Sequence, residues 1–278
     1  MSGAPGTSFG ADFRLTLLTD DPALAAEADA AGVDRIGADL EHMGKAARQA
    51  GADVRLSSHT VEDLRAVAGV VKRASAFVRI NPLHPGSPQE IETVLAVGAQ
   101  AVMLPYFEGP QDAERFVRLL DGRARALLLV ETPAAVAQAR EIFAVAGIDE
   151  AMLGLNDLRL AMGLESHFQL LVSPRAAQLA EEAARAGLRL SAGGVASPEA
   201  QGLPIPPDLV LAQYPRLGIT GAWLSRSFVS RTARLDLAKG VAGIRRRLDE
   251  WAKAGPDALE DARARLADTL ASQGHGTR

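Results

Sequence analysis

The 278-residue sequence contains no cysteine. This absence excludes disulfide bonds, zinc sites with thiolate ligands and cysteine nucleophiles. Lysine is scarce, and the only ones are Lys45, Lys72, Lys239 and Lys253. None of them stands at the carboxyl end of an expected strand, so a mechanism that forms a Schiff base on a buried lysine is not expected.

Long apolar runs and long basic stretches are missing too. No apolar run approaches the roughly 20 residues that a membrane-spanning helix needs. Charged residues are spread along the chain and the formal net charge is −4, so neither a membrane nor nucleic acid is an expected partner. The first residues lack the charged and apolar regions of a signal peptide, which makes a cytoplasmic location the expectation.

What the chain does contain is an alternation of strand and helix patterns. Hydrophobic residues make up 47% of the sequence, enough for a large core. Strands are expected at residues 13–18, 33–39, 76–80, 100–104, 127–130, 150–155, 188–192 and 219–224. This pattern predicts an α/β fold, a single (β/α)8 TIM barrel over residues 13–235. Residues 1–12, rich in Gly, Ser and Pro, are expected to form a flexible tail.

Residues 236–278 are predicted to form a helical extension beyond the barrel. Val241, Ile244, Leu248 and Trp251 recur at helical spacing, and a second apolar stripe follows after residue 256. Such stripes must be buried, either on the end of the barrel itself or on another subunit. We expect these helices to hold subunits together in a homo-oligomer, a trimer or hexamer.

Two neighbouring expected strands lead to carboxylates. The apolar run 127–130 ends on Glu131, and the following strand ends on Asn156 and Asp157. The carboxyl ends of barrel strands carry the chemistry of this fold, and a charge beside the core needs a partner because its desolvation is costly. A hard divalent cation is the simplest partner for Glu131 and Asp157. The alternative is that Glu131 caps the next helix and Asp157 pairs with an arginine.

Other strand ends add polar groups to the same rim. Asp39 and His42 follow the second expected strand, and Arg79 ends the third. His42 is a candidate base, with His59 and His84 in nearby loops as its competitors. Arg79 offers a permanent charge and a fork of donors that suits the oxygens of an acid. A surface loop histidine and a structural ion pair are the alternatives.

Small residues follow the last two expected strands. Gly193 and Gly194 end the seventh, and Ser225 and Arg226 follow the eighth, where many barrels hold a phosphate. Glycines let backbone N–H groups approach an anion, and Arg226 is able to pair with it. We expect these residues, together with Asn156, to bind substrate, and tight turns with a helix cap are the alternative.

Five segments in this order resemble the HpcH/HpaI aldolase and citrate lyase β-subunit family. They are VDRIGADLEH, AFVRINP, GAQAVMLP, LLLVETP and GLNDL. The resemblance implies a metal-dependent barrel of the pyruvate/phosphoenolpyruvate type. It implies that Glu131 and Asp157 bind Mg2+, with Mn2+, Co2+ or Zn2+ as alternatives, and that Arg79 contacts the 2-oxo acid. It further implies that Asp39 and His42 form an acid–base dyad.

Some positions depart from the family pattern. Leu129 stands where the aldolases often carry Gln, and Tyr106 replaces a Lys common in the lyase branch.

Three functions are compatible with these observations. The first is a class II aldolase or lyase that makes or cleaves the bond between the enolate of pyruvate, or a similar 2-oxo acid, and an aldehyde. The second is an acyl-CoA lyase or synthase of the citrate lyase type. The third is a non-catalytic barrel that binds a metabolite.

Overall fold

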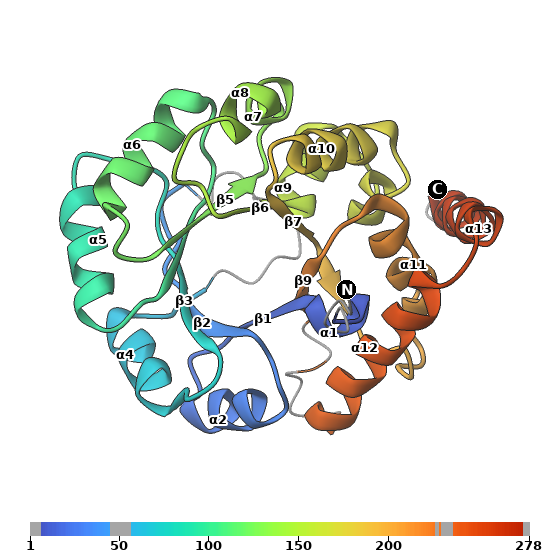
Figure 1. Ribbon diagram of the computed structural model, residues 1–278, viewed down its shortest axis with the longest axis horizontal. Helices are drawn as coiled ribbons and strands as arrows, with labels where there is room; N and C mark the ends of the chain where they lie inside the picture. The colour runs from blue at the N-terminus through green and yellow to red at the C-terminus, as the bar shows by residue number, and fades with distance from the viewer. Residues whose placement is uncertain (1–6, 45–56, 226–227, 229–235, 275–278) are drawn as a thin grey trace, which may run out of the picture.

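Parallel strands form a closed barrel surrounded by helices (Figure 1). The structure, a computed structural model, describes residues 7–44, 57–225, 228 and 236–274. The strands in this part of the chain are β1 (Arg14–Leu18), β2 (Arg35–Asp39), β3 (Ser75–Arg79), β4 (Ala101–Leu104), β5 (Arg125–Val130), β6 (Glu150–Leu153), β7 (Arg189–Ala192), β8 (Gly194–Val195) and β9 (Gly221–Leu224). The predicted TIM barrel is confirmed.

The barrel closes between its last strands. β8 continues β7 after a single residue, Gly193, and both run beside β9. Thr220 donates its backbone N–H to Leu190 at 2.8 Å, and Trp223 donates to Gly193 at 3.0 Å. On its other side β9 pairs with β1, so β7 and β8 together take one of the eight strand positions.

Helices cover the outside of the barrel. They are α1 (Phe9–Asp12), α2 (Pro22–Ala30), α4 (Val61–Val70), α5 (Ser87–Ala96), α6 (Pro110–Leu120), α7 (Pro133–Ala137), α8 (Ala139–Phe143), α9 (Leu155–Ala161), α10 (Pro174–Arg185), α11 (Pro207–Leu217), α12 (Leu237–Ala252) and α13 (Pro256–Gly274). Many begin at proline, whose missing N–H is not needed in the first turn. No helix in the described ranges is long and apolar enough to cross a membrane.

The interior of the barrel is packed with apolar side chains. This inner cluster consists of Phe77, Ala101, Met103, Leu127, Leu129 and Met152, with Leu18 and Trp223 against it. A larger cluster fills the space between the strands and the outer helices. The barrel is therefore a solid core, and chemistry is confined to its ends.

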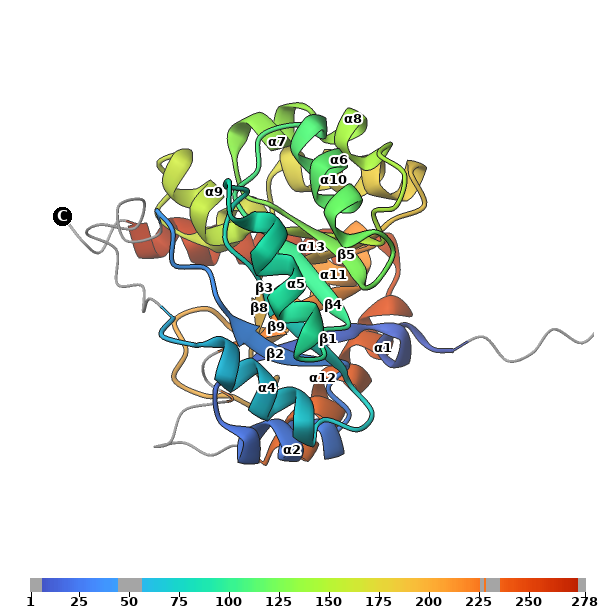
Figure 2. The ribbon, with the colours of Figure 1, turned by 90° about the vertical axis from the view of Figure 1, so that its left-hand side faces the viewer.

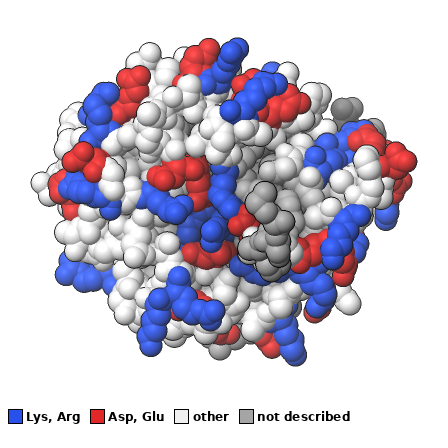
Figure 3. Space-filling model, in the orientation of Figure 1, with Lys and Arg blue, Asp and Glu red and all other residues white. Residues whose placement is uncertain are grey.

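The amino-terminal ends of the strands carry paired charges. Figure 3 views this end, and arginine and acidic side chains are mixed at its centre. Arg35, which is buried, donates to Glu150 Oε2 at 2.8 Å and to Thr16 Oγ1 at 3.1 Å. Arg125 lies 3.6 Å from the same glutamate. Glu150 thus offsets part of the positive charge of the two arginines.

Residues 9–12, which the sequence assigns to a flexible tail, form α1 instead. α1 lies between the start of β1 and α12 (Figures 1 and 2). Arg245 of α12 donates to the carbonyl oxygens of Gly10 and Phe13 at 2.8 and 2.9 Å. A side chain at Gly10 would meet the backbone of Arg245, with its Cβ 2.0 Å from the carbonyl oxygen. The glycine thus allows the close contact that ties α1 to α12.

The stripe on α12 is buried within the chain itself. Val241, Ile244 and Leu248 are at most 2% exposed, and α12 packs on α1 and α11. The second stripe is buried in the same way, because α13 packs on α11. The expected homo-oligomer stays a prediction, and these stripes no longer support it.

Leu248→Ala is expected to destabilise the protein by about 2–5 kcal/mol, because it leaves a cavity in a packed core. Denaturation by urea measures this loss. Arg246→Ala on the same helix is the control, since its side chain is 63% exposed. If Leu248→Ala dissociated a larger assembly without loss of stability, the stripe would be an interface between subunits.

Candidate active site

Arg79 and Asp39 form a two-pronged ion pair at the carboxyl rim of the barrel. They end β3 and β2, and the parallel register places them side by side. Arg79 donates from Nε to Asp39 Oδ1 at 2.8 Å and from Nη2 to Oδ2 at 2.7 Å. Glu41 Oε2 lies 3.3 Å from the same Nε. The fork therefore holds carboxylates of the chain itself, and among the described residues Nη1 has no hydrogen-bond partner.

This setting keeps Arg79 charged. Burial works against the charged form, but the carboxylates of Asp39 and Glu41 outweigh it and raise the pKa of Arg79 above its ordinary value. Glu41, which sequence reasoning did not single out, is 2% exposed. A second acid two residues after Asp39, the last residue of β2, was the signal available in the sequence.

Glu131 is a buried carboxylate directly after β5, and its side chain is not a helix cap. The cap of α7 is Thr132, whose Oγ1 accepts the N–H of Ala135 at 3.0 Å, so the capping alternative is wrong. Burial is the largest cause that raises the pKa of Glu131 to about 8; the charges of Glu41 and Asp157 act in the same direction, and Arg79 acts against them. The surroundings of Glu131 therefore hold too little positive charge to balance its ionised form, and a bound cation would supply that charge.

Two backbone features shape the surroundings of Glu131. Tyr106 has a left-handed φ of 49° and donates its N–H to Glu131 Oε1 at 3.0 Å. Gly154 lies so close that a Cβ there would come within 2.4 Å of Glu131 Cβ and 2.8 Å of Oε2. A glycine is therefore required after β6 for Glu131 to reach the rim.

The sequence predicts Asp157 at the end of a strand. In the structure it lies instead in the first turn of α9. β6 ends at Leu153, and α9 begins at Leu155. The expected strand was too long because the apolar Leu155 continues its pattern, whereas this side chain is buried in the outer core.

Glu131 and Asp157 line the same cavity, which has a volume of about 240 Å³. Its other walls are Tyr106, Thr132, Pro133, Leu160 and Ala161. In the described ranges no group of three or more acidic or histidine side chains converges as a metal site. Two carboxylates are nevertheless the number with which Mg2+ is often held, together with water and substrate oxygens. The donor set therefore fits a divalent cation.

The rim histidines differ in their contacts. The Nε2 atom of His42 lies 3.2 Å from the carbonyl oxygen of His59, and His42 itself is exposed. His59 accepts the backbone N–H of Asp39 at its Nδ1 atom, at 3.1 Å. His84 pairs with Glu90 at 3.0 Å. Of the three, His42 has the ring most open to solvent, and its dyad with Asp39 stays a prediction.

Asn81 fixes the loop that carries His42. Its Oδ1 accepts the backbone N–H groups of His42 and Met43, each at 2.9 Å. Glu90 in turn holds the Asn81 side chain at 2.8 Å. Sequence reasoning missed this role, although Asn81 follows the third strand directly after the buried Ile80.

Comparison with known sequences identifies the family. The profile of the HpcH/HpaI aldolase/citrate lyase family matches residues 14–188. The chain belongs to this family. No curated protein matches the sequence significantly.

Solved structures of HpcH/HpaI proteins share the fold. An HpcH/HpaI aldolase from Desulfitobacterium hafniense superposes with a TM-score of 0.63 at 19% identity, over 85% of this chain and 93% of that one. A family protein from Burkholderia cenocepacia gives 0.61 at 18% identity, over 86% and 94%. The citrate synthase SbnG gives 0.58 at 17% identity, over 80% and 90%.

The remaining expected residues of this HpcH/HpaI chain that the structure describes lie on the same rim. Gly193, with φ of 50°, joins β7 to β8 and touches Leu155. Gly194 faces Ser225, and Asn156 is in the first turn of α9. The turn role of Gly193 is visible, whereas Gly194 is the first residue of β8, and the role of both in substrate binding stays a prediction. Arg226 lies outside the described residues.

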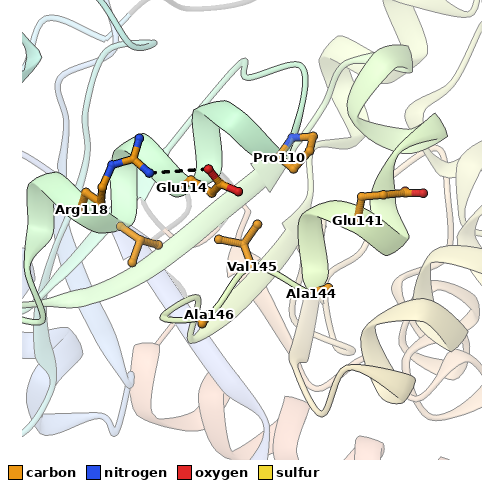
Figure 4. A pocket seen from close by; sticks show the side chains of 8 residues that line it. Pro110, Glu114, Arg118, Glu141, Ala144, Val145 and Ala146 are labelled. Carbon is orange, nitrogen blue, oxygen red and sulfur yellow. Dashed lines mark ion pairs between the residues drawn. The ribbon is translucent and has the colours of Figure 1, made fainter.

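A larger hollow of about 400 Å³ lies elsewhere, on the outside between α6 and α8 (Figure 4). It is flanked by the ion pair of Arg118 with Glu114, 3.5 Å apart, and by Glu141 on α8. It does not contain the rim carboxylates. The smaller cavity at Glu131 is the candidate active site of this HpcH/HpaI protein.

Proposed function

We propose that this chain is a divalent-metal-dependent aldolase or lyase that forms the enolate of pyruvate, or of a similar 2-oxo acid. The enolate is joined to an aldehyde or released from a 4-hydroxy-2-oxo acid. The observation that carries the proposal is the buried Glu131, which shares a cavity with Asp157 and lies in the field of Arg79. Membership of an aldolase and lyase family supports it.

Each residue has a stated task in this proposal. Glu131 and Asp157 would hold the cation, which supplies Lewis-acid polarisation of the keto oxygen when bound. Arg79 binds the keto oxygen of the acid through Nη1, which has no hydrogen-bond partner among the described residues, and stabilises the negative charge that develops on that oxygen. His42 takes the proton from the 4-hydroxyl group in cleavage, while the C3–C4 electron pair moves into the enolate, and returns it in synthesis.

The cavity favours an aldehyde over a CoA thioester. Among the described residues that line it, none is a lysine or arginine able to pair with CoA phosphates. Tyr106 stands where the lyase branch commonly carries Lys. The thioester reaction is therefore the second outcome to be tested.

Incubation of the protein with pyruvate in D2O and Mg2+ or Mn2+ is expected to replace the methyl protons with deuterium. Enolate formation needs no aldehyde, so the methyl signal in proton NMR should fade. A chelator should stop the exchange because the enolate loses its main electrostatic support. Exchange on an acyl-CoA alone would indicate the thioester reaction. No exchange on any common 2-oxo acid or on an acyl-CoA, with any common divalent metal, would contradict both.

A further inference from the structure

We propose that Trp223 is a positioning residue of this site. Its indole ring supports the face of the Arg79 guanidinium, so that Nη1 stays available to the keto oxygen of a 2-oxo acid. The inference rests on the proposed function. It adds to the site a residue of β9, which lies outside the five segments that resemble the family.

Trp223 contacts Arg79 inside the barrel. The Cζ atom of Arg79 lies over the indole, 5.5 Å from the ring centroid. This distance is within the range of about 6 Å over which a cation is attracted to an aromatic face. The Arg79 side chain is only 14% exposed, so water screens this attraction weakly.

The indole is itself held in place. Its ring meets Phe77 edge to face, with centroids 5.7 Å apart and planes at 80°. Its backbone is fixed between β1 and β8, opposite Thr16 and Gly194. Phe77 precedes Arg79 by two residues on β3, so one strand contributes both contacts of the ring. Trp223 is thus a rigid support that belongs to the sheet.

Two contacts together define the place of the guanidinium. Asp39 and Glu41 hold the Nε and Nη2 edge, and Trp223 holds a face. The contacts on one edge of the guanidinium still allow the Arg79 group to tilt about its ion pair. The contact of Trp223 with the face of the guanidinium opposes this tilt. Loss of the indole ring should therefore weaken the binding of the 2-oxo acid. It should not change the affinity of Glu131 and Asp157 for the cation.

The test compares Trp223→Leu with Trp223→Phe, which keeps an aromatic face. Trp251→Leu is the matched control, because Trp251 is the second of the two tryptophans and also contacts an arginine, Arg247, at 4.7 Å, but on the outer helix α12. Calorimetry gives the Kd of Mn2+ alone and of pyruvate at saturating Mn2+. Circular dichroism checks folding, and Trp223→Met replaces the Leu variant if that does not fold.

We expect Trp223→Leu to raise the Kd of pyruvate about tenfold, Trp223→Phe less than about threefold, and Trp251→Leu not at all. The Kd of Mn2+ should stay unchanged in all three. Unchanged pyruvate binding in Trp223→Leu would overturn the inference while the proposed function stands. Equal losses for Mn2+ and pyruvate, or equal losses in the Leu and Phe variants, would also overturn it. A wild-type protein that binds no pyruvate would remove the proposed function and this inference with it.

Discussion

Glu131→Gln is expected to lose divalent-metal binding by at least about 100-fold, because loss of even a partner beyond the ligands costs 10- to 100-fold in metal affinity. The side chain is 3% exposed, and glutamine has nearly the same shape, so the fold should persist. Calorimetric titration with Mn2+ measures the loss. The matched control is Glu141→Gln, an exposed glutamate on the outer helix α8, which should bind Mn2+ as the wild type does.

The same variant should make the metal-free protein more stable at high pH. Burial raises the pKa of Glu131 to about 8 from an ordinary value of 4.5, so the folded state binds its proton more tightly than the unfolded state. The contribution of this group to stability is present below pH 4.5 and is lost as the pH rises to about 8. Glutamine carries no such penalty. Thermal unfolding with chelator should show a gain at pH 9 and little at pH 5, and equal Tm shifts at both would contradict the cause given.

Arg79→Met is expected to slow pyruvate methyl exchange by about 100-fold or more, because it removes a charged donor to the developing enolate. It should also destabilise the fold by about 3–5 kcal/mol, since the buried carboxylates of Asp39 and Glu41 lose the positive charge of Arg79. Exchange followed by NMR and unfolding by urea measure the two effects separately. Arg185→Met, which breaks an exposed pair on α10, should cost less than about 1 kcal/mol and leave exchange intact.

The double variant Asp39→Asn with Arg79→Met separates the two roles of this arginine. Removal of the Asp39 charge should restore part of the lost stability, because only one of the two buried carboxylates then remains charged in the absence of Arg79. Exchange should stay slow, since the donor to the substrate is still missing. A double variant that recovers exchange along with stability would show that Arg79 serves the fold alone.

The barrel and most of its rim follow from sequence because parallel strands buried on both faces are continuous apolar runs. The polar residue that ends such a run marks the rim, as Asp39, Arg79 and Glu131 do. Asp157 shows the limit of this reasoning. Leu155 looks like strand because it is apolar, yet Gly154 ends β6 there so that the chain can pass Glu131 closely.

Contacts between distant strands could not be predicted in the same way. The sequence shows that Arg79 offers a fork of donors, but only the register of β2 and β3 shows that Asp39 takes it. Trp223 looks like an apolar strand residue, and its contact with Arg79 across the barrel depends on closure between β9 and β1. The stripe of α12 predicts burial, but it carries no information on which surface provides it.

The tie between α1 and α12 bears on how the chain folds while it is being synthesised. Arg245 and its acceptor Gly10 are 235 residues apart, so the beginning of the protein leaves the ribosome long before its partner exists. Until α12 emerges, the carbonyl groups around Gly10 and Phe13 have only water as a partner. The early strands must wait in a half-built barrel with open edges, a state that is prone to aggregation. Slow translation would prolong that wait, which ends for the edge of β1 when residues 221–224 of β9 appear and for α1 only when residues 237–252 follow.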